Sequence, residues 1–208
     1  MGEIITVDQM GEIVPRYEFR AFAQTFGRVA ERIRELSPCE NIRESTDIYI
    51  ISAGTDEHNT KIRSNQMDIK DFVQEVKGLE QWTPRVKAEF PIAAADLREY
   101  IFPAWSVDMP ELTRDAYTQA QYLDEIIRPH PALLTARVYK VRFSFTIHEC
   151  ITEIAHLEIN GAAIRTVAVE SEDIDAVLDA KETLGLDAYA NVNYLVAIKR
   201  IMGLAPLP

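Results

Sequence analysis

The chain has 208 residues, of which 47% are hydrophobic and 26% are charged. This composition is typical of a globular protein with a buried core and argues against a disordered chain. There are 33 Asp and Glu residues against 22 Lys and Arg residues, which gives a formal net charge of −11. Such a charge argues against general affinity for long nucleic acids or anionic membranes. It is compatible with a local basic pocket, so the positions of the basic residues matter most.

The sequence gives no indication of export or membrane insertion. No run approaches the roughly 18–20 apolar residues that span a bilayer, and the N-terminus lacks a basic start and an apolar signal core. The two cysteines, Cys39 and Cys150, are isolated and have no metal or redox spacing, which predicts two reduced thiols. We therefore expect a cytoplasmic protein.

The first part of the chain predicts several strands and one helix. Residues 15–22 alternate between charged and apolar side chains, which is the period of a half-buried strand. Residues 25–36 place apolar side chains at spacings of three and four, which predicts a helix ended by Pro38. A β-branched run at 47–52 precedes a turn-rich segment and a return strand, so a hairpin is expected there. The strands expected in this part lie at 15–22, 47–52, 60–63, 70–79 and 85–92.

The second part predicts helices on either side of another group of strands. Helices are expected at 93–102, 110–127, 173–184 and 192–202, and strands at 134–147, 150–159 and 164–170. About eight strands with short links and peripheral helices predict an α+β fold with a closed antiparallel β-barrel. We expect a single domain over residues 1–208, with halves at about 15–92 and 132–202 joined by a helical segment at 93–131.

Charged side chains occupy every second position of several predicted strands. The sets are Arg16, Glu18 and Arg20; Lys61 and Arg63; Glu75 and Lys77; Arg85, Lys87 and Glu89; and Lys140 and Arg142. Because side chains alternate along a strand, each set projects from one face. That face is either the solvent side of the sheet or the lumen of a closed sheet. A lumen of this kind suits a polyanion, because Arg and Lys neutralise phosphate oxygens and carboxylates hold Mg²⁺ or Mn²⁺.

The order of these motifs resembles a known family. Arg16-Tyr17-Glu18-Phe19-Arg20 stands where that family has a first strand of Glu-x-Glu-x-Lys form. The further matching motifs are Lys61-Ile62-Arg63, Val76-Lys77-Gly78, Arg85-Val86-Lys87-Ala88-Glu89, Lys140-Val141-Arg142, Val169-Glu170-Ser171-Glu172-Asp173, Leu184-Gly185-Leu186 and Asn193-Tyr194-Leu195. In this order the motifs resemble the CYTH superfamily, the triphosphate tunnel metalloenzymes, over about residues 15–202.

The resemblance implies a function and a set of site residues. It implies a phosphohydrolase that depends on a divalent metal, Mg²⁺ or Mn²⁺, and acts on a triphosphate or polyphosphate compound inside a charged tunnel. Cyclisation of a nucleoside triphosphate is a related reaction of the family. The implied metal ligands are Glu18, Glu89 and Glu170, with Glu153 or Glu158 as further candidates. The implied phosphate-binding residues are Arg20, Lys61, Arg63, Lys77, Arg85, Lys87, Lys140 and Arg142.

One departure from the family pattern opens an alternative. Arg16 replaces the first glutamate of the first strand, and Arg20 replaces its lysine. This change removes an oxygen ligand and adds a positive charge beside the implied metal position. The alternative is a non-catalytic binder of phosphorylated ligands with a degenerate metal site. A third possibility is an interaction protein that forms homo-oligomers through apolar residues around Ile101, Phe102 and Trp105. In the first two cases the expected partner is a small phosphorylated ligand held in a basic lumen with an acidic outer shell.

Overall fold

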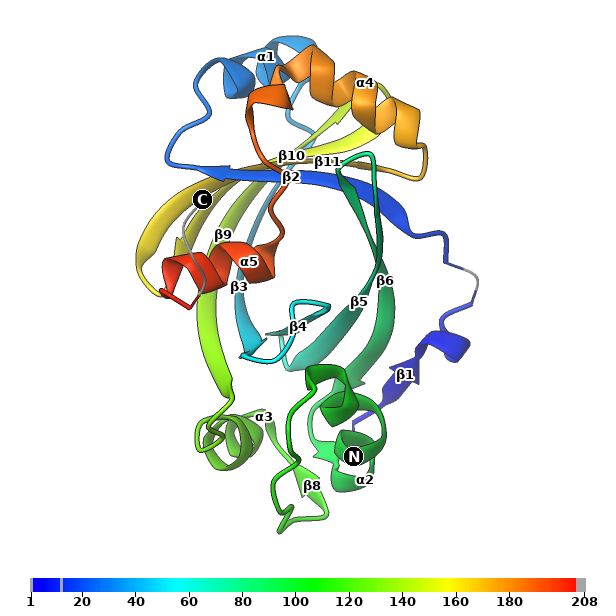
Figure 1. Cartoon of the computed structure of the whole chain (residues 1–208), viewed down its shortest axis with the longest axis vertical. Helices are drawn as coiled ribbons and strands as arrows, with labels where there is room; N and C mark the ends of the chain where they lie inside the picture. The colour runs from blue at the N-terminus through cyan, green and yellow to red at the C-terminus, as the bar shows by residue number, and fades with distance from the viewer. Residues whose placement is uncertain (1, 12, 205–208) are drawn as a thin grey trace. The chain divides into compact units, whose positions relative to one another are not determined.

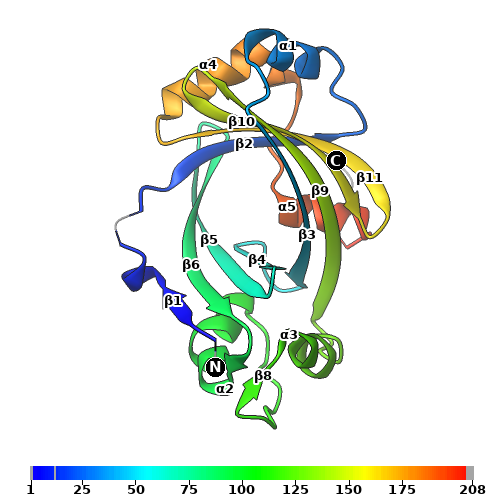
Figure 2. The same cartoon turned by 180° about the vertical axis from the view of Figure 1, so that it is seen from behind.

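Strands of the computed structural model form one closed antiparallel sheet (Figures 1 and 2). The structure describes residues 2–11 and 13–204. In hydrogen-bonding order the strands are β6 (Leu79–Glu89), β2 (Arg16–Ala23), β11 (Ala162–Ser171), β10 (Cys150–Ile159), β9 (Leu133–Ile147), β3 (Asn41–Ser52), β4 (His58–Arg63) and β5 (Gln66–Val76). Strand β5 also pairs with β6, which closes the order, and β1 (Ile4–Thr6) pairs with β6. The predicted α+β class and closed antiparallel sheet are confirmed.

Helices and a small second sheet complete the secondary structure. The α-helices are α1 (Arg28–Leu36), α2 (Ala94–Asp96), α3 (Gln119–Gln121), α4 (Ile174–Leu184) and α5 (Tyr194–Ile201). Helix α2 continues into a π-helical turn at Leu97–Ile101, and α3 continues into another at Tyr122–Ile127. Short 3₁₀ turns lie at Val7–Gln9, Phe102–Trp105 and Leu186–Ala188. Strands β7 (Ile92–Ala93) and β8 (Ala116–Tyr117) form the second sheet.

The chain divides into two compact units, and each has its own hydrophobic core. Unit 1 consists of residues 1–13, 47–72 and 83–137. Its core joins alternate positions of the strands, such as Ile62 and Met67, to apolar side chains of the segment from β7 to α3. Trp105 is fully buried in this core, and its Nε1 donates a hydrogen bond to Thr60 Oγ1 at 3.0 Å.

The burial of this segment corrects one expectation. Ile101 and Trp105 are 0% exposed and Phe102 is 3% exposed, because all three pack in the core of unit 1. The prediction that they form an exposed apolar surface is therefore wrong, and they give no support to a homo-oligomer.

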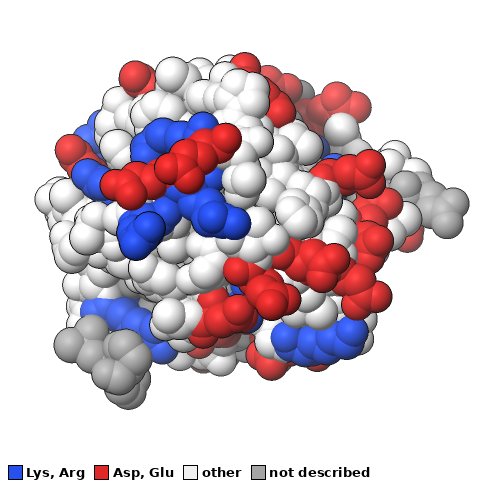
Figure 3. Space-filling model, turned by 90° about the horizontal axis from the view of Figure 1, so that it is seen from above, with Lys and Arg blue, Asp and Glu red and all other residues white. Residues whose placement is uncertain are grey.

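Unit 2 consists of residues 14–46, 73–82 and 138–208. Its core lies between one face of β2, β9, β10 and β11 and the two helices α1 and α4, which cover that face in both views (Figures 1 and 2). Phe19 and Val167 of the strands pack with Ile33 of α1 and Val177 of α4. The outer side of these helices carries basic and acidic side chains close together (Figure 3).

Local capping fixes the start of α4 and of α5 and the end of α4. Asp173 caps α4, because its carboxylate accepts hydrogen bonds from the backbone N–H of Asp175 at 2.9 Å and of Ala176 at 3.3 Å. Gly185 ends this helix with a left-handed φ of 70°, which glycine adopts without strain. Asn193 caps α5 by accepting from the Val196 N–H at 3.0 Å. This cap fixes the start of α5 at Tyr194.

Most predicted elements are found with small shifts, and one is substantially different. The helix expected over 110–127 begins only at Gln119, because residues 110–115 have no regular structure and Ala116 pairs with Ala93 in the second sheet. Strand β1 is an addition to the predicted elements. No helix among the described residues is long and apolar enough to cross a membrane. That residues 1–208 form a single domain stays a prediction.

Candidate functional site

Charged side chains lie on the face of the unit 2 strands opposite the α1 and α4 helices. On β2 they alternate with the core residues Phe19 and Ala21, so Glu18 and Arg20 share the other face. In the strand register Glu18 is opposite Glu170 of β11. Arg20 is only 9% exposed and Lys140 of β9 only 3% exposed. These two side chains therefore do not belong to a solvent face.

Arg20 is the centre of a polar network on this face. Its Nε donates to Glu18 Oε1 at 2.6 Å, and its Nη1 donates to Glu153 Oε1 at 3.3 Å and lies 3.5 Å from Thr166 Oγ1. Burial lowers the pKa of Arg20, but attraction to the negative charges of Glu18 and Glu153 outweighs it, so the pKa lies well above its ordinary value. The guanidinium is therefore permanently charged.

Two further basic side chains of β9 lie in the same network. Arg142 Nη1 is 3.8 Å from Glu153 Oε2, which is an ion-pair distance rather than a hydrogen bond. Arg142 Nε and Nη2 are buried and have no hydrogen-bond partner in the described part of the chain. Lys140 Nζ lies 4.0 Å from the ring centre of Tyr194, the first residue of α5. Two buried guanidinium donors without acceptors are costly, so an acceptor at this position would stabilise the site.

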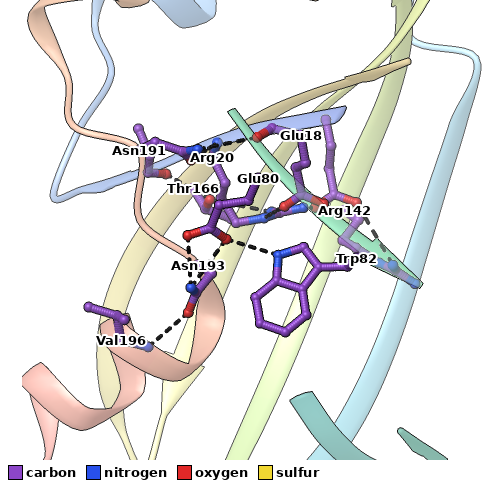
Figure 4. A network of polar contacts seen from close by, with 11 residues as sticks. Glu18, Arg20, Glu80, Trp82, Arg142, Thr166, Asn191, Asn193 and Val196 are labelled. Atoms are coloured by element: carbon purple, nitrogen blue, oxygen red, sulfur yellow. Dashed lines mark hydrogen bonds and ion pairs between the residues drawn. The ribbon is translucent and has the colours of Figure 1, made fainter. Parts of the chain in front are cut away.

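The segment before α5 is bonded to the backbone of β2. Asn191 Oδ1 accepts from the Arg20 N–H at 2.8 Å, and Asn191 Nδ2 donates to the carbonyls of Glu18 at 3.2 Å and Gly78 at 2.9 Å. The Val192 N–H donates to the Arg20 carbonyl at 2.7 Å. Asn191 therefore fixes the backbone from which the Glu18 and Arg20 side chains project (Figure 4).

Glu80 of β6 extends the network beside Asn193. Its carboxylate accepts from Asn193 Nδ2 at 3.0 and 3.2 Å and from Trp82 Nε1 at 2.9 Å (Figure 4). Burial raises the pKa of Glu80, although the hydrogen bonds from Trp82 and Asn193 oppose this shift. In the register of β2 and β6, Glu80 lies opposite Glu18 and Trp82 lies opposite Arg16.

Unit 1 holds a second set of charged pairs on β3, β4, β5 and β6. Arg63 bonds Asp47 with two contacts of 2.5 Å, and Asp47 is 0% exposed. Lys61 Nζ is 2.9 Å from Asp68 Oδ2, and burial lowers the pKa of this lysine. Further along β5, Asp71 accepts from Arg85 at 3.1 Å and lies 2.7 Å from the Nδ1 of His58. Each of these basic side chains has a nearby carboxylate.

The structure distributes the predicted site residues unevenly. The unit 2 network contains Glu18, Glu170, Arg20, Lys140 and Arg142, and the unit 1 pairs contain Lys61, Arg63 and Arg85. Three predicted residues lie outside both groups. Lys87 and Glu89 are exposed on β6. Lys77 lies in the turn after β5, where its exposed ammonium is 3.1 Å from Asp175 of α4.

Comparison with known proteins identifies the fold. No family model and no curated protein matches the sequence. Among solved structures, a Hippeastrum protein reported to have a dominant triphosphatase activity matches with a TM-score of 0.55 and 13% identity over 93% of this chain and 98% of its own. A conserved hypothetical protein of Pyrococcus furiosus matches with a TM-score of 0.52 and 12% identity, over 86% of this chain and 98% of its own. A protein of Pyrococcus horikoshii matches with a TM-score of 0.51 and 12% identity, over 88% of this chain and 98% of its own.

The chain has the triphosphate tunnel fold. At 12–13% identity these matches establish the fold alone. They agree with the ordered motifs that suggested this fold from the sequence, and the predicted resemblance is confirmed at that level.

The carboxylates of unit 2 do not fit a divalent cation in this arrangement of the tunnel fold. Glu18 is bonded to Arg20, Glu153 faces both Arg20 and Arg142, and Glu170 Oε1 lies 3.6 Å from Arg16 Nη1. Mg²⁺ and Mn²⁺ need several oxygen ligands, and a neighbouring guanidinium repels them. Within residues 2–11 and 13–204, no three or more His, Cys, Asp or Glu side chains are grouped to hold a metal ion.

Several residues of this tunnel-fold site have little or no role in the sequence prediction, among them Glu153, Asn191 and Tyr194. Glu153 is predicted only as a candidate metal ligand, but it joins Arg20 to Arg142. Asn191 and Tyr194 come from the end of the chain, where the motif Asn193-Tyr194-Leu195 implies no role for its residues. The alternation of side chains along β10 could have indicated the face on which Glu153 lies. Nothing in the sequence near Asn191 indicates its contact with Arg20.

Proposed function

We propose that the chain binds a small ligand carrying a short linear chain of phosphates at the charged face of unit 2. The carrying observation is Arg142, whose Nε and Nη2 are buried donors without an acceptor among the described residues. Phosphate oxygens are strong acceptors, and their charge and spacing match a guanidinium. Lys140 and Arg20, in the same network, add positive charge for a ligand with several phosphates.

The surrounding contacts favour a ligand over a purely structural ion-pair network. Arg142 pairs with the carboxylate of Glu153 only at 3.8 Å, and this carboxylate also bonds Arg20. Arg16 is 47% exposed at the start of β2, so its guanidinium is accessible to an incoming anion. A ligand oxygen at Arg142 would remove the cost of two unsatisfied buried donors.

A binding measurement with inorganic tripolyphosphate tests this proposal. Isothermal titration of the full chain should show binding, and Arg142→Gln should weaken it by about tenfold or more, because a hydrogen bond to a charged group contributes about 1.5–3 kcal/mol. Lys77→Gln is the matched control, since Lys77 is exposed and bonds Asp175 outside the network. Absence of binding, or equal losses in the two variants, would contradict the proposal.

The second candidate function is hydrolysis of a triphosphate with Mg²⁺ or Mn²⁺. It is supported by the shared fold with the Hippeastrum protein, which is reported to have a dominant triphosphatase activity. The side chains of unit 2 argue against it, because each carboxylate of Glu18, Glu153 and Glu170 is beside a guanidinium.

Phosphate release separates these two functions. Tripolyphosphate and ATP would be incubated with the chain and Mg²⁺ or Mn²⁺, alongside the Arg16→Glu variant, which restores the first glutamate of the family pattern. Binding without release by the natural sequence favours the binder. Release by the natural sequence, above a blank without protein, establishes the hydrolase instead.

A further inference from the structure

We infer that anion binding at the unit 2 site is independent of divalent cations and is weakened by them. This inference rests on the proposed binding of a polyphosphate at that site. Its basis is the pairing of three of the site's carboxylates with arginines. The paired carboxylates are Glu18, Glu153 and Glu170, and the arginines are Arg16, Arg20 and Arg142.

One oxygen of Glu18, one of Glu170 and both of Glu153 lie next to guanidinium groups. Glu18 Oε1 is 2.6 Å from Arg20 Nε, and both side chains project from β2 two residues apart. Glu153 uses Oε1 for Arg20 at 3.3 Å and Oε2 for Arg142 at 3.8 Å. Since Arg20 is buried and its pKa lies well above the ordinary value, this positive charge is not lost at any physiological pH.

Arg16 has a particular effect because of the strand register. Glu18 of β2 lies directly opposite Glu170 of β11, so these two carboxylates are neighbours on adjacent strands. Two neighbouring carboxylates alone would attract a divalent cation. Arg16 is on the same strand face as Glu18, and its Nη1 lies 3.6 Å from Glu170 Oε1. The Arg16 guanidinium therefore supplies positive charge at this position and disfavours a metal ion there.

A divalent cation also changes the ligand. Mg²⁺ bound to a polyphosphate removes two negative charges and covers oxygens that a guanidinium would otherwise bond. The magnesium complex therefore has weaker electrostatic attraction to the basic side chains of the site, and fewer hydrogen bonds with them, than the free polyphosphate has. The free polyphosphate is thus the preferred ligand, and added Mg²⁺ competes for it.

The experiment compares tripolyphosphate binding by the full chain in EDTA and in millimolar Mg²⁺, by isothermal titration at constant ionic strength. We expect binding in EDTA and a loss of about tenfold in excess Mg²⁺, equivalent to about 1.4 kcal/mol. Binding that requires Mg²⁺ or Mn²⁺ would overturn the inference and leave the proposed ligand class intact. Absence of binding in both buffers would overturn the proposed function, and the inference with it.

The Arg16→Glu variant gives a second readout that does not use the phosphate ligand. It places a third carboxylate beside Glu18 and Glu170, so the protein should gain affinity for Mn²⁺, seen as loss of the free-ion signal in electron paramagnetic resonance. Arg28→Glu is the matched control, because Arg28 is exposed at the start of α1 and the variant changes the net charge equally. Equal Mn²⁺ binding by the two variants, or strong Mn²⁺ binding by the natural sequence, would overturn the inference.

Discussion

The ammonium group of Lys140 lies 4.0 Å from the centre of the Tyr194 ring, and both side chains are buried. The same ring lies 4.8 Å from Arg20 Cζ and makes an edge contact with Phe22 at 5.3 Å. Burial raises the pKa of Tyr194 above its ordinary value, so the phenol stays neutral. An aromatic ring in contact with two buried cations stabilises both, since its faces carry negative potential.

Replacement of Tyr194 should therefore depend on the ring more than on the hydroxyl. Tyr194→Leu removes the cation–π contacts and the Phe22 contact, and we expect it to lower the free energy of unfolding by about 2–4 kcal/mol. Tyr194→Phe keeps the ring and should lose less than half of that. Urea unfolding of the two variants measures the difference, and equal losses would show that the hydroxyl carries the effect.

Asn191 should be important for stability although its side chain is small. Its amide bonds the Arg20 N–H and the carbonyls of Glu18 and Gly78, so Asn191→Ala removes three hydrogen bonds. We expect a loss of about 2–3 kcal/mol in the free energy of unfolding. Gln24→Ala is the control, because Gln24 makes one exposed bond to the Ala163 carbonyl and its loss should stay within about 0.5 kcal/mol. Similar losses in both variants would contradict this role.

The fold could be predicted largely because strand alternation is a local signal. Charged and apolar side chains alternate from Arg16 to Ala21, and this pattern alone assigns Arg20 to the face opposite Phe19. The helix predicted over 110–127 failed for the opposite reason. Ala116 pairs with Ala93, which is distant in sequence, and this tertiary contact overrides the local helical pattern.

The site could be predicted only in part because its contacts join distant residues. The alternation of Lys140 and Arg142 assigns them to one face. The partners of the site residues depend on strand register and on contacts between segments far apart in sequence. Arg20, for example, bonds Glu153, 133 residues later, and Asn191, 171 residues later. A single sequence carries no record of these pairings.

The buried pair of Asp47 and Arg63 in unit 1 should contribute far more than an exposed pair of the same geometry. Asp47 is fully buried and accepts two bonds of 2.5 Å from Arg63. Asp47→Asn leaves a guanidinium facing an amide N–H₂, and we expect a loss of about 3–5 kcal/mol in the free energy of unfolding. The matched control is Glu125→Gln, which breaks the exposed two-bond pair with Arg114 and should cost less than about 1 kcal/mol. Chemical denaturation of both variants makes the comparison, and equal losses would refute it.

His156 of β10 should give unit 2 a pH-dependent stability. His156 is exposed, but incomplete hydration of its ring lowers its pKa below the ordinary 6.5, and the positive charges of Arg165 and Arg34 lower it further. The unfolded chain therefore binds this proton at a higher pH than the folded chain does. Between the two pKa values the unfolded state holds more protons, so the free energy of unfolding rises with pH there. The contribution of neutral His156 to the free energy of unfolding is complete above pH 6.5 and is lost as the pH falls through the folded-state pKa.

The His156→Gln variant isolates this contribution, because glutamine has no proton to gain in this range. Urea unfolding at about pH 7.5 and about pH 5.5 should show that the natural sequence loses more stability on acidification than the variant does. The comparison uses the difference between the two pH values within each protein, so any constant effect of the substitution on packing cancels. A larger acid loss in the variant would mean that the folded state binds the proton more tightly than the unfolded state, which is opposite to the effect expected from the desolvated ring and the nearby Arg165.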